Sequence, residues 1–268
     1  MKKLFFLKLG GSLITNKDQE STVRMDRLIS IGEQISRALK TDPDITLLIG
    51  HGSGSFGHHA AKKFGTREGF VEPAEAQHYW QGFFAVYQQA HALNKLVMDA
   101  MHKTGNPCIE FAPNTMIKTK DHVITQWSVE SIKAAMQARL IPVIYGDVVF
   151  DDVIGGTILS TEELFGFLAG SLKPQKIYLA GIEDGVWEDY PANKNLITKI
   201  NANNFDHYRK AIIGSGSIDV TGGMDSKVRQ MLSLTEEVEG LSIRVFSGIP
   251  EDNIYKALTG MEIGTSIE

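Results

Sequence analysis

The sequence contains little cysteine, no long apolar run and no concentrated positive charge. Cys108 is the one cysteine among 268 residues, so an internal disulfide is excluded and a reducing cytoplasm is the expected location. The apolar runs are far shorter than a membrane span, and the first residues lack the layout of a signal peptide. The net charge of −5 comes from acids and bases spread along the chain. We therefore expect neither a membrane nor a nucleic-acid partner.

Internal repeats, low-complexity tracts, linkers and a Walker A motif are also missing from the sequence. What is present is an alternation of short apolar strands with helical patterns along the whole chain. This alternation predicts an α/β fold, a three-layer αβα sandwich with a mostly parallel central sheet. The length is sufficient for one large core, and we expect a single domain over residues 1–268.

The expected elements follow from apolar periodicity and from turn and capping residues. Strands are predicted at residues 4–9, 45–49, 108–111, 141–145, 176–180 and 243–246. Helices are predicted at residues 24–40, 73–103, 129–139 and 253–258, with two more beginning near Ser160 and after Thr221-Gly222-Gly223, the latter ending near 238. A hairpin is expected with strands at 148–150 and 153–154 around a turn at Asp151-Asp152. The strand at 243–246 is expected to be the last of the sheet.

Residues 50–57, GHGSGSFG, form a glycine-rich segment directly after the strand at 45–49, and we call this segment the glycine loop. Glycines at a strand end expose backbone N–H groups with no Cβ in the way, which suits a bound phosphate. His58 follows the loop, where its side chain can donate a proton to that phosphate. The segment predicts a phosphate site, and a plain glycine-rich turn is the alternative.

Two other interpretations of this segment are weaker. The G-x-G-x-x-G pattern within it matches the dinucleotide-binding fingerprint, which requires an acidic residue about twenty positions later at the end of a strand. At that distance the chain has Glu72 and Glu75, which flank a proline at a predicted helix start. His51, His58 and His59 could be taken for metal ligands, but side chains of adjacent residues diverge on a strand or a helix. We therefore expect no metal site made of protein ligands.

Two further segments combine glycines with a lysine. Lys8 lies in an otherwise apolar strand, shortly before the diglycine Gly10-Gly11. Burying its ammonium group there is costly in free energy unless an anion binds to it. Lys17 follows closely enough to reach the same site. Lys227 lies one turn into the helix that follows Gly222-Gly223, which also builds an anion site. Lys8 could instead lie on a sheet edge and extend its ammonium group to solvent, and Lys17 taken singly could be an ordinary surface lysine. The three segments together favour phosphate binding.

The helix predicted at 73–103 is rich in aromatic side chains, namely Tyr79, Trp80, Phe83, Phe84 and Tyr87. They can be core residues of a buried helix, or as a group they can form the wall of an apolar substrate pocket. At helical spacing Tyr79 and Phe83 share one face.

Three motifs in order resemble those of the amino acid kinase superfamily. They are Lys8-Leu9-Gly10-Gly11-Ser12 for K-x-G-G-S, Asp184-Gly185-Val186 for D-G-V, and Thr221-Gly222-Gly223-Met224-x-x-Lys227 for T-G-G-M-x-x-K. The resemblance extends from about residue 3 to residue 250. Residues 51–58 are similar to the H-G-G-G-S-F-G-H of isopentenyl phosphate kinases, and fosfomycin kinases share this histidine and lysine pattern.

The resemblance implies an ATP-dependent, Mg²⁺-using kinase for a small-molecule phosphate acceptor, usually a homodimer. An acceptor-binding lobe would span about residues 1–170 and a nucleotide-binding lobe about 171–268. Lys8, Lys17 and His58 would be catalytic, with both lysines on the transferred phosphoryl group and His58 on the acceptor phosphate. The acceptor would also meet Ser53, Gly54, Asp147 (at the carboxyl end of the strand at 141–145) and Thr161. The nucleotide phosphates would meet Lys8, Gly10, Gly11, Ser12, Gly54, Asp184, Gly222 and Lys227.

The chain departs from the family pattern at two places. Ser53 replaces the middle glycine of the loop motif, and Ser160-Thr161-Glu162 stands where the family usually shows S-G-D. We expect phosphorylation of isopentenyl phosphate first. A kinase for a phosphonate such as fosfomycin, or for another small phosphorylated alcohol, is the alternative enzyme. A non-catalytic ATP-sensing domain is the non-enzyme alternative, and a dehydrogenase rests only on the G-x-G-x-x-G match.

Overall fold

The computed structural model describes residues 3–16, 18–70, 72–214 and 223–268. Within these residues the central sheet has eight strands. Their spatial order is β12 (Lys199–Ile200), β14 (Thr265–Ile267), β13 (Ser242–Ser247), β9 (Lys176–Gly181), β1 (Lys3–Leu9), β2 (Ile45–His51), β6 (Ile141–Tyr145) and β3 (Cys108–Glu110). All neighbouring pairs are parallel except β13 with β14. The predicted α/β fold with a mostly parallel sheet is confirmed.

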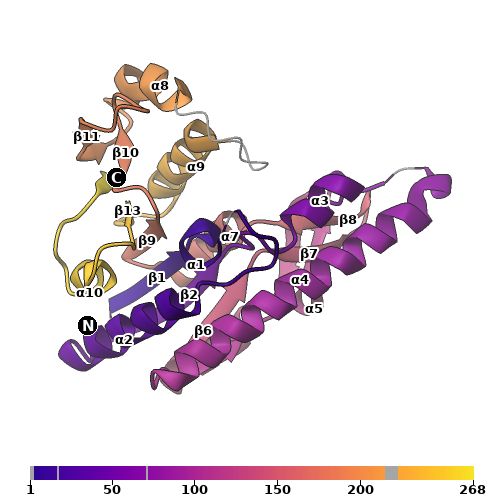
Figure 1. Ribbon diagram of the computed structural model, residues 1–268, viewed down its shortest axis with the longest axis horizontal. Helices are drawn as coiled ribbons and strands as arrows, with labels where there is room; N and C mark the ends of the chain where they lie inside the picture. The colour runs from indigo at the N-terminus through magenta and orange to yellow at the C-terminus, as the bar shows by residue number, and fades with distance from the viewer. Residues whose placement is uncertain (1–2, 17, 71, 215–222) are drawn as a thin grey trace.

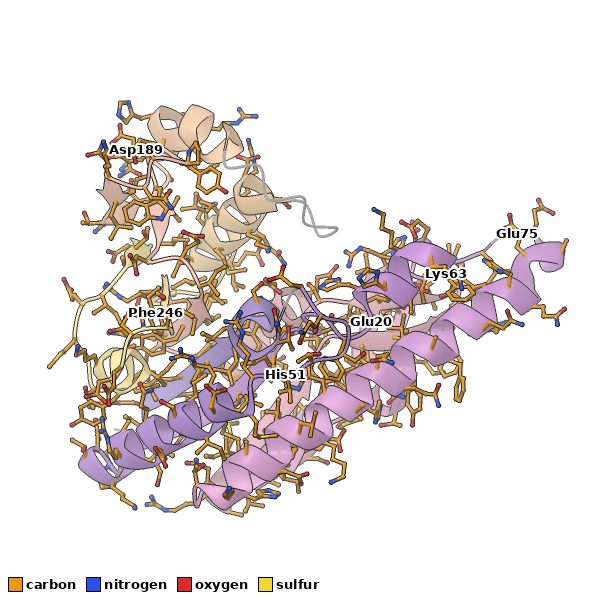
Figure 2. The ribbon with its side chains drawn as sticks, in the orientation of Figure 1. Glu20, His51, Lys63, Glu75, Asp189 and Phe246 are labelled. Atoms are coloured by element: carbon orange, nitrogen blue, oxygen red, sulfur yellow. The ribbon has the colours of Figure 1, made fainter. Side chains whose placement is uncertain are left out.

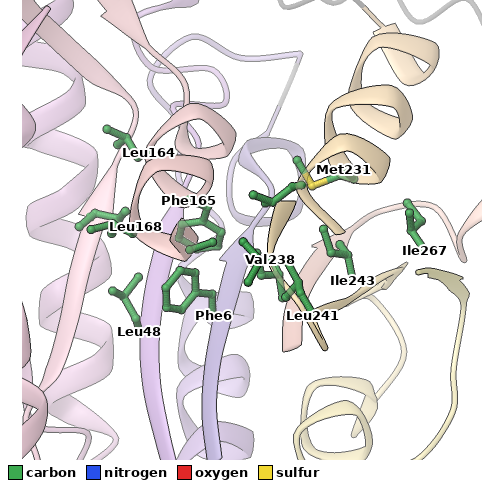
Figure 3. Packing of buried hydrophobic residues seen from close by; sticks show 14 of the residues in the cluster. Phe6, Leu48, Leu164, Phe165, Leu168, Met231, Val238, Leu241, Ile243 and Ile267 are labelled. Carbon is green, nitrogen blue, oxygen red and sulfur yellow. The ribbon is translucent and has the colours of Figure 1, made fainter. Parts of the chain in front are cut away.

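Strand β1 is central because its side chains are apolar toward both faces of the sheet. Phe5, Leu7 and Leu9 belong to the hydrophobic core on one face, and Phe6 belongs to the core on the other. Figure 3 shows Phe6 packed beside Leu48 and against Phe165, whose ring centroid is 5.1 Å from that of Phe6. A strand buried on both faces is typical of parallel sheets covered by helices on each side.

Helices form the two outer layers, as Figure 1 shows. One face carries α1 (Gly11–Ile14), α2 (Met25–Thr41), α4 (Ala76–Lys103) and α10 (Asn253–Leu258). The other carries α6 (Glu130–Gln137), α7 (Thr161–Leu172) and α9 (Gly223–Glu237). Among the described helices, none combines the length and apolar character that crossing a bilayer requires.

Most predicted helices agree with the structure because their end signals are local. Helix α10 has the predicted bounds, and α2 is shifted by one residue at each end. The helix predicted from residue 73 begins as a short 3-10 turn, η1 (Pro73–Glu75), and continues as α4. Helix α7 starts with a capping box, in which Ser160 Oγ accepts from the Glu163 N–H and a Glu163 carboxylate oxygen accepts from the Ser160 N–H.

The structure corrects the prediction for residues 117–159. A second sheet of four strands, in the order β5 (Val123–Trp127), β4 (Ile117–Lys120), β7 (Asp147–Asp151) and β8 (Gly155–Leu159), was not predicted beyond a hairpin. The predicted hairpin turn at Asp151-Asp152 is wrong, because the turn spans residues 152–154. Asp151 Oδ1 accepts the N–H groups of Val153 and Ile154, so those residues belong to the turn and cannot pair as a strand.

The strand at 243–246 is not the last of the sheet, because β14 and β12 continue it beyond β13. These strands and the separate pair β10 (Val186–Trp187) and β11 (Leu196–Ile197) have two or three residues each, too few for an apolar alternation to be recognised. Three helices complete the described residues: α3 (His58–Phe64), α5 (Pro113–Met116) and α8 (Phe205–Gly214).

Candidate active site

Two glycine segments meet at the carboxyl ends of β1 and β2. Leu9 is paired with His51 in parallel register, so Gly10-Gly11 and the glycine loop leave the sheet side by side. The backbones of Gly11 and Gly54 are so close that a Cβ on either residue would overlap the other, and Gly54 has a φ of +54° that disfavours side chains. Bare backbone of this kind lets phosphate groups approach closely.

Lys8 points from β1 to the face that α7 covers. Its Nζ lies 2.6 Å from Glu162 Oε1, and the two side chains are 15% and 10% exposed. Burial alone would raise the pKa of Glu162, but the charge and hydrogen bond of Lys8 hold this pKa below its ordinary value. Glu162 is therefore ionised near neutral pH and holds the Lys8 ammonium at the strand end.

The positive charge of Lys227, on α9, also contributes to lowering the pKa of Glu162. Lys8 and Lys227, which are far apart in sequence, therefore both stabilise the ionised form of one acidic residue. Two other residues predicted for this site, Lys17 and Gly222, lie outside the described residues.

His58 directly follows the glycine loop and is the first residue of α3. Gly57 before it has a φ of +78°, and this left-handed conformation turns the chain from the loop into the helix. His58 is exposed, whereas Ser53 is half-buried and its carbonyl accepts the Phe56 N–H at 2.9 Å. The half-buried Ser12 lies in α1, directly after the diglycine.

Asp147 and Thr161 have buried side chains, at 0% and 1% exposure. Thr161 Oγ1 donates to the His51 carbonyl at 2.6 Å, so this side chain is turned toward the glycine loop. Asp147 Oδ1 accepts the Val148 N–H at 2.8 Å. Direct contact of either side chain with a substrate would require it to exchange these partners.

Asp184 is exposed and lies just beyond β9, at the same edge of the sheet as the glycine segments. Strand β9 pairs with β1, and the Gly10 N–H donates to the Ala180 carbonyl at 2.8 Å. Lys8, Gly10 and Asp184 therefore belong to one continuous edge, which is where ligands bind in open α/β sheets.

Residues 3–247 match the family model described as "Amino acid kinase family". The chain belongs to the amino acid kinase family. Members of this family are small-molecule phosphotransferases, so the protein is an enzyme of that class, and kinase chemistry implies the use of ATP.

This amino acid kinase is similar over its whole length to proteins named isopentenyl phosphate kinase. The relative from Methanocaldococcus jannaschii is 33% identical, with 99% of this chain and 98% of the relative covered. The relative from Methanothermobacter thermautotrophicus is 29% identical, with 98% of each chain covered.

Solved structures agree with this family assignment. A crystal structure of isopentenyl phosphate kinase superposes with a TM-score of 0.83 at 27% identity, covering 99% of this chain and all of the other. The N-acetylglutamate synthase from Neisseria gonorrhoeae superposes with a TM-score of 0.67 at 15% identity, with 59% of its chain covered, which shows a shared fold.

Beside α3, this amino acid kinase has a small apolar cluster separate from the two main cores. It consists of Tyr79, Phe83 and Val86 from α4 and Val148 from β7. Tyr79 and Phe83 share a face as predicted, at 2% and 9% exposure, whereas Phe84 is 57% exposed and points away. We call these four residues with the adjoining Phe70 and Trp80 the apolar cluster.

Two functional arrangements of this amino acid kinase were not found from the sequence. The first is the pairing of Glu162 with Lys8. The sequence signal for it was that Glu162 stands at the position of the acidic residue in the family's S-G-D motif. The second is a polar cluster behind the glycine loop, in which His51 (labelled in Figure 2) contacts Asn94 Oδ1 through Nε2 at 3.1 Å and stacks its ring on Tyr145. Burial lowers the pKa of His51, so its imidazole is neutral and supports the loop.

This polar cluster extends to the surface of this amino acid kinase. The Tyr145 hydroxyl donates to Glu110 at 2.6 Å and also contacts His91, whose Nε2 lies 3.3 Å from Asp147 Oδ2. The Asp147 carboxylate raises the pKa of His91, and burial raises that of Asp147. This pair therefore binds a proton more tightly than either group does in water.

Proposed function

We propose that the protein transfers the γ-phosphoryl group of ATP to isopentenyl phosphate, giving isopentenyl diphosphate and ADP. The observation that carries this proposal is the position of the glycine loop between a charged site and the apolar cluster, among whose side chains the acceptor tail would bind. Its first glycines adjoin Gly11 and the Lys8–Glu162 pair, and a Cβ on Gly57 would lie 3.8 Å from Val86. An acceptor with an anionic head and a short apolar tail suits this arrangement.

The proposed roles follow from this placement. Lys8 neutralises charge on the transferring phosphoryl group, and Lys17 has the same role by resemblance. His58 at the start of α3 donates to a non-transferring oxygen of the acceptor phosphate. Gly10, Gly11, Ser12 and Gly54 contact the phosphates through their backbones.

The nucleotide would lie beyond this edge, near Asp184, Gly222 and Lys227. We propose accordingly that residues 1–170 bind mainly the acceptor and residues 171–268 mainly the nucleotide. The family resemblance also predicts a homodimer, which sedimentation analysis of the purified protein can test.

Transfer needs little chemistry from side chains. An oxygen of the acceptor phosphate forms a bond to the γ-phosphorus while the bond from that phosphorus to the bridging oxygen of ADP breaks. The attacking oxygen is already anionic, so a general base is unnecessary and the site must supply positive charge and position. Glu162 is a positioning residue in this scheme because it holds Lys8 at the strand end.

Mg²⁺ would bind mainly through the phosphates of ATP. Within the described part of the chain, no group of three or more His, Cys, Asp or Glu side chains is placed to hold a metal ion. Mg²⁺ commonly keeps several waters and binds nucleotide phosphates with one or two carboxylates. The ion would neutralise charge on those phosphates during transfer.

The two departures from the family pattern are compatible with this acceptor. The Thr161 hydroxyl is bonded to the His51 carbonyl, and its methyl group is packed against Gly50, where a Cβ would meet it at 2.5 Å. Thr161 therefore supports the glycine loop from behind. Ser53 can meet the acceptor through its backbone or its hydroxyl.

An ADP-release assay across a panel of acceptors tests the proposal. The panel contains isopentenyl phosphate, dimethylallyl phosphate, longer prenyl phosphates, fosfomycin and amino acids, and ³¹P NMR identifies the product. We expect the highest kcat/KM for isopentenyl phosphate and a diphosphate product. A preference for fosfomycin would support the phosphonate kinase alternative, and a preference for an amino acid would overturn both.

A further inference from the structure

The loop at residues 65–70 packs against the apolar cluster and would form one wall of a tail pocket at this place. The Tyr79 hydroxyl donates to the Thr66 carbonyl at 3.2 Å, and the ring of Phe70 lies 5.1 Å from that of Tyr79 and 5.6 Å from that of Trp80, between centroids. The Phe70 N–H donates to the Ile154 carbonyl at 3.0 Å. The wall is therefore held by single hydrogen bonds and ring contacts along its length.

Arg67 in the middle of this loop is bonded more extensively than its neighbours. Its Nη1 donates to the Ile158 carbonyl of β8 at 3.2 Å, and its Nη2 donates to Glu163 Oε1 of α7 at 3.0 Å. Its own carbonyl accepts the Thr157 hydroxyl at 2.7 Å. Arg67 thus ties the pocket wall both to β8 and to α7.

The α7 end of this connection is next to the charged site. Glu163 Oε2 accepts the Ser160 N–H at 2.6 Å, so its two oxygens join the helix cap to Arg67. The preceding residue, Glu162, holds Lys8. Two adjacent glutamates in the first turn of α7 therefore connect the lysine at the phosphate end with the wall at the tail end.

We propose that Arg67 is a positioning residue that sets acceptor chain length, because it fixes the wall at residues 65–70 relative to Lys8. This inference rests on the proposed function, since it assigns the tail of a prenyl phosphate to a pocket among the side chains of the apolar cluster. With the guanidinium in place the wall cannot move outward, and tails longer than five carbons are rejected. Without it the wall is free to yield to a longer tail.

The kinetic test compares Arg67→Met and Arg67→Lys with the wild type on five-, ten- and fifteen-carbon prenyl monophosphates. We expect Arg67→Met to shift the kcat/KM ratio toward the longer acceptors by about tenfold, the discrimination typical of an apolar pocket. The shift should appear in the acceptor KM, with the ATP KM unchanged. Arg67→Lys should restore part of the ratio, since one ammonium group cannot reproduce both guanidinium contacts.

Arg37→Met is the matched control, because Arg37 pairs with Asp252 on the surface, and the two side chains are 52% and 40% exposed. It should keep the wild-type ratio. An unchanged ratio in Arg67→Met with a lower melting temperature would overturn the proposal and leave Arg67 a stabilising residue. If Arg67→Met does not fold, the kcat/KM ratios of Arg67→Gln are compared with those of the wild type on the same acceptors.

Amide hydrogen exchange without substrate gives a second, independent readout. Arg67→Met should accelerate exchange at residues 65–70 and leave α2 unchanged. Unaltered exchange in the loop would overturn the proposal. If the wild type does not phosphorylate isopentenyl phosphate, the proposed function fails, while the exchange data still decide whether Arg67 holds the wall.

Discussion

Lys8 and Glu162 form the contact on which the proposed chemistry depends at the scale of single residues. An unpaired ammonium group in a central strand would be strongly unfavourable, so the partner matters for folding as well as for catalysis. The pair joins positions 154 residues apart. The charge of Lys227 on α9 also lowers the pKa of this carboxylate, so Glu162 responds to cations from β1 and from α9.

Replacing Glu162 with Gln should lower kcat on the order of a hundredfold, because Lys8 loses the charge that orients it. Steady-state kinetics at saturating ATP and acceptor measure the effect, and a melting curve separates it from loss of folding. Glu130→Gln is the control, since this first-turn glutamate of α6 pairs with Lys133 at the surface. A Glu162→Gln enzyme with near-normal kcat would show that Lys8 is oriented without this carboxylate.

His58 distinguishes between acceptor classes. Its contact with an acceptor phosphate would exist in the ground state and the transition state, so His58→Ala should raise the acceptor KM and lower kcat. His58→Gln should keep part of the activity because an amide can still donate a hydrogen bond. Calorimetric titration with ATP should give wild-type affinity in both variants. Equal loss of ATP and acceptor binding would instead assign His58 to folding of the loop.

At the scale of elements, the hairpin of β7 and β8 depends on a single carboxylate. Asp151 Oδ1 accepts the N–H groups of Asp121, Val153 and Ile154, and Oδ2 accepts that of His122. Burial alone would raise the pKa of Asp151, but these bonds and one with Thr119 lower it well below its ordinary value. Asp151 therefore fastens the β4–β5 turn to the β7–β8 turn.

Asp151→Asn should destabilise the protein by about 1–3 kcal/mol, because an amide has one acceptor oxygen and must face its NH₂ toward a donor. The pKa of the folded state is depressed, so this stabilisation is complete above the unfolded pKa of about 3.9 and is lost as the pH falls through the folded pKa. Urea unfolding at several pH values measures both effects. If the difference in unfolding free energy between wild type and variant does not decrease as the pH is lowered, the ionised Asp151 carboxylate is not its source.

Helix α4 offers a matched pair of aromatic residues. Phe83 is 9% exposed in the apolar cluster, and Phe84, the next residue, is 57% exposed. Phe83→Ala should admit longer prenyl phosphates, with each additional buried CH₂ adding up to about 0.8 kcal/mol. Phe84→Ala should keep the parent preference. The kcat/KM values for acceptors of different chain length test this prediction. If both variants keep the five-carbon preference, the pocket wall lies elsewhere.

The whole molecule should respond to nucleotide as a kinase of this family. ATP binds the folded state, so ATP at 100 times its dissociation constant should stabilise folding by about 2.7 kcal/mol and raise the melting temperature. NAD at the same concentration should leave it unchanged, since the glycine loop lacks the acidic partner of a dinucleotide site. Thermal melts with each nucleotide make the comparison. Stabilisation by NAD alone would contradict the assignment of this loop to phosphate transfer.

The sequence by itself determined the features that depend on neighbouring residues. The apolar runs of β1, β2, β6 and β9, the capping residue Ser160 and the glycines after β1 and β2 are local signals. Strand burial, helix caps and the backbone freedom of glycine act within a few residues. The fold class could therefore be predicted, and the same local signals support the proposal that this edge of the sheet binds phosphate.

Only the tertiary structure decided which distant residues meet. It assigned Glu162 to Lys8, turned Phe83 inward and Phe84 outward, and tied Arg67 to Glu163 across 96 positions. It also showed that Asp151 belongs to two turns, because its carboxylate accepts the N–H groups of Asp121 and His122 as well as that of Val153. Such contacts arise from the packing of separate elements, and a single sequence carries no periodic signal for them.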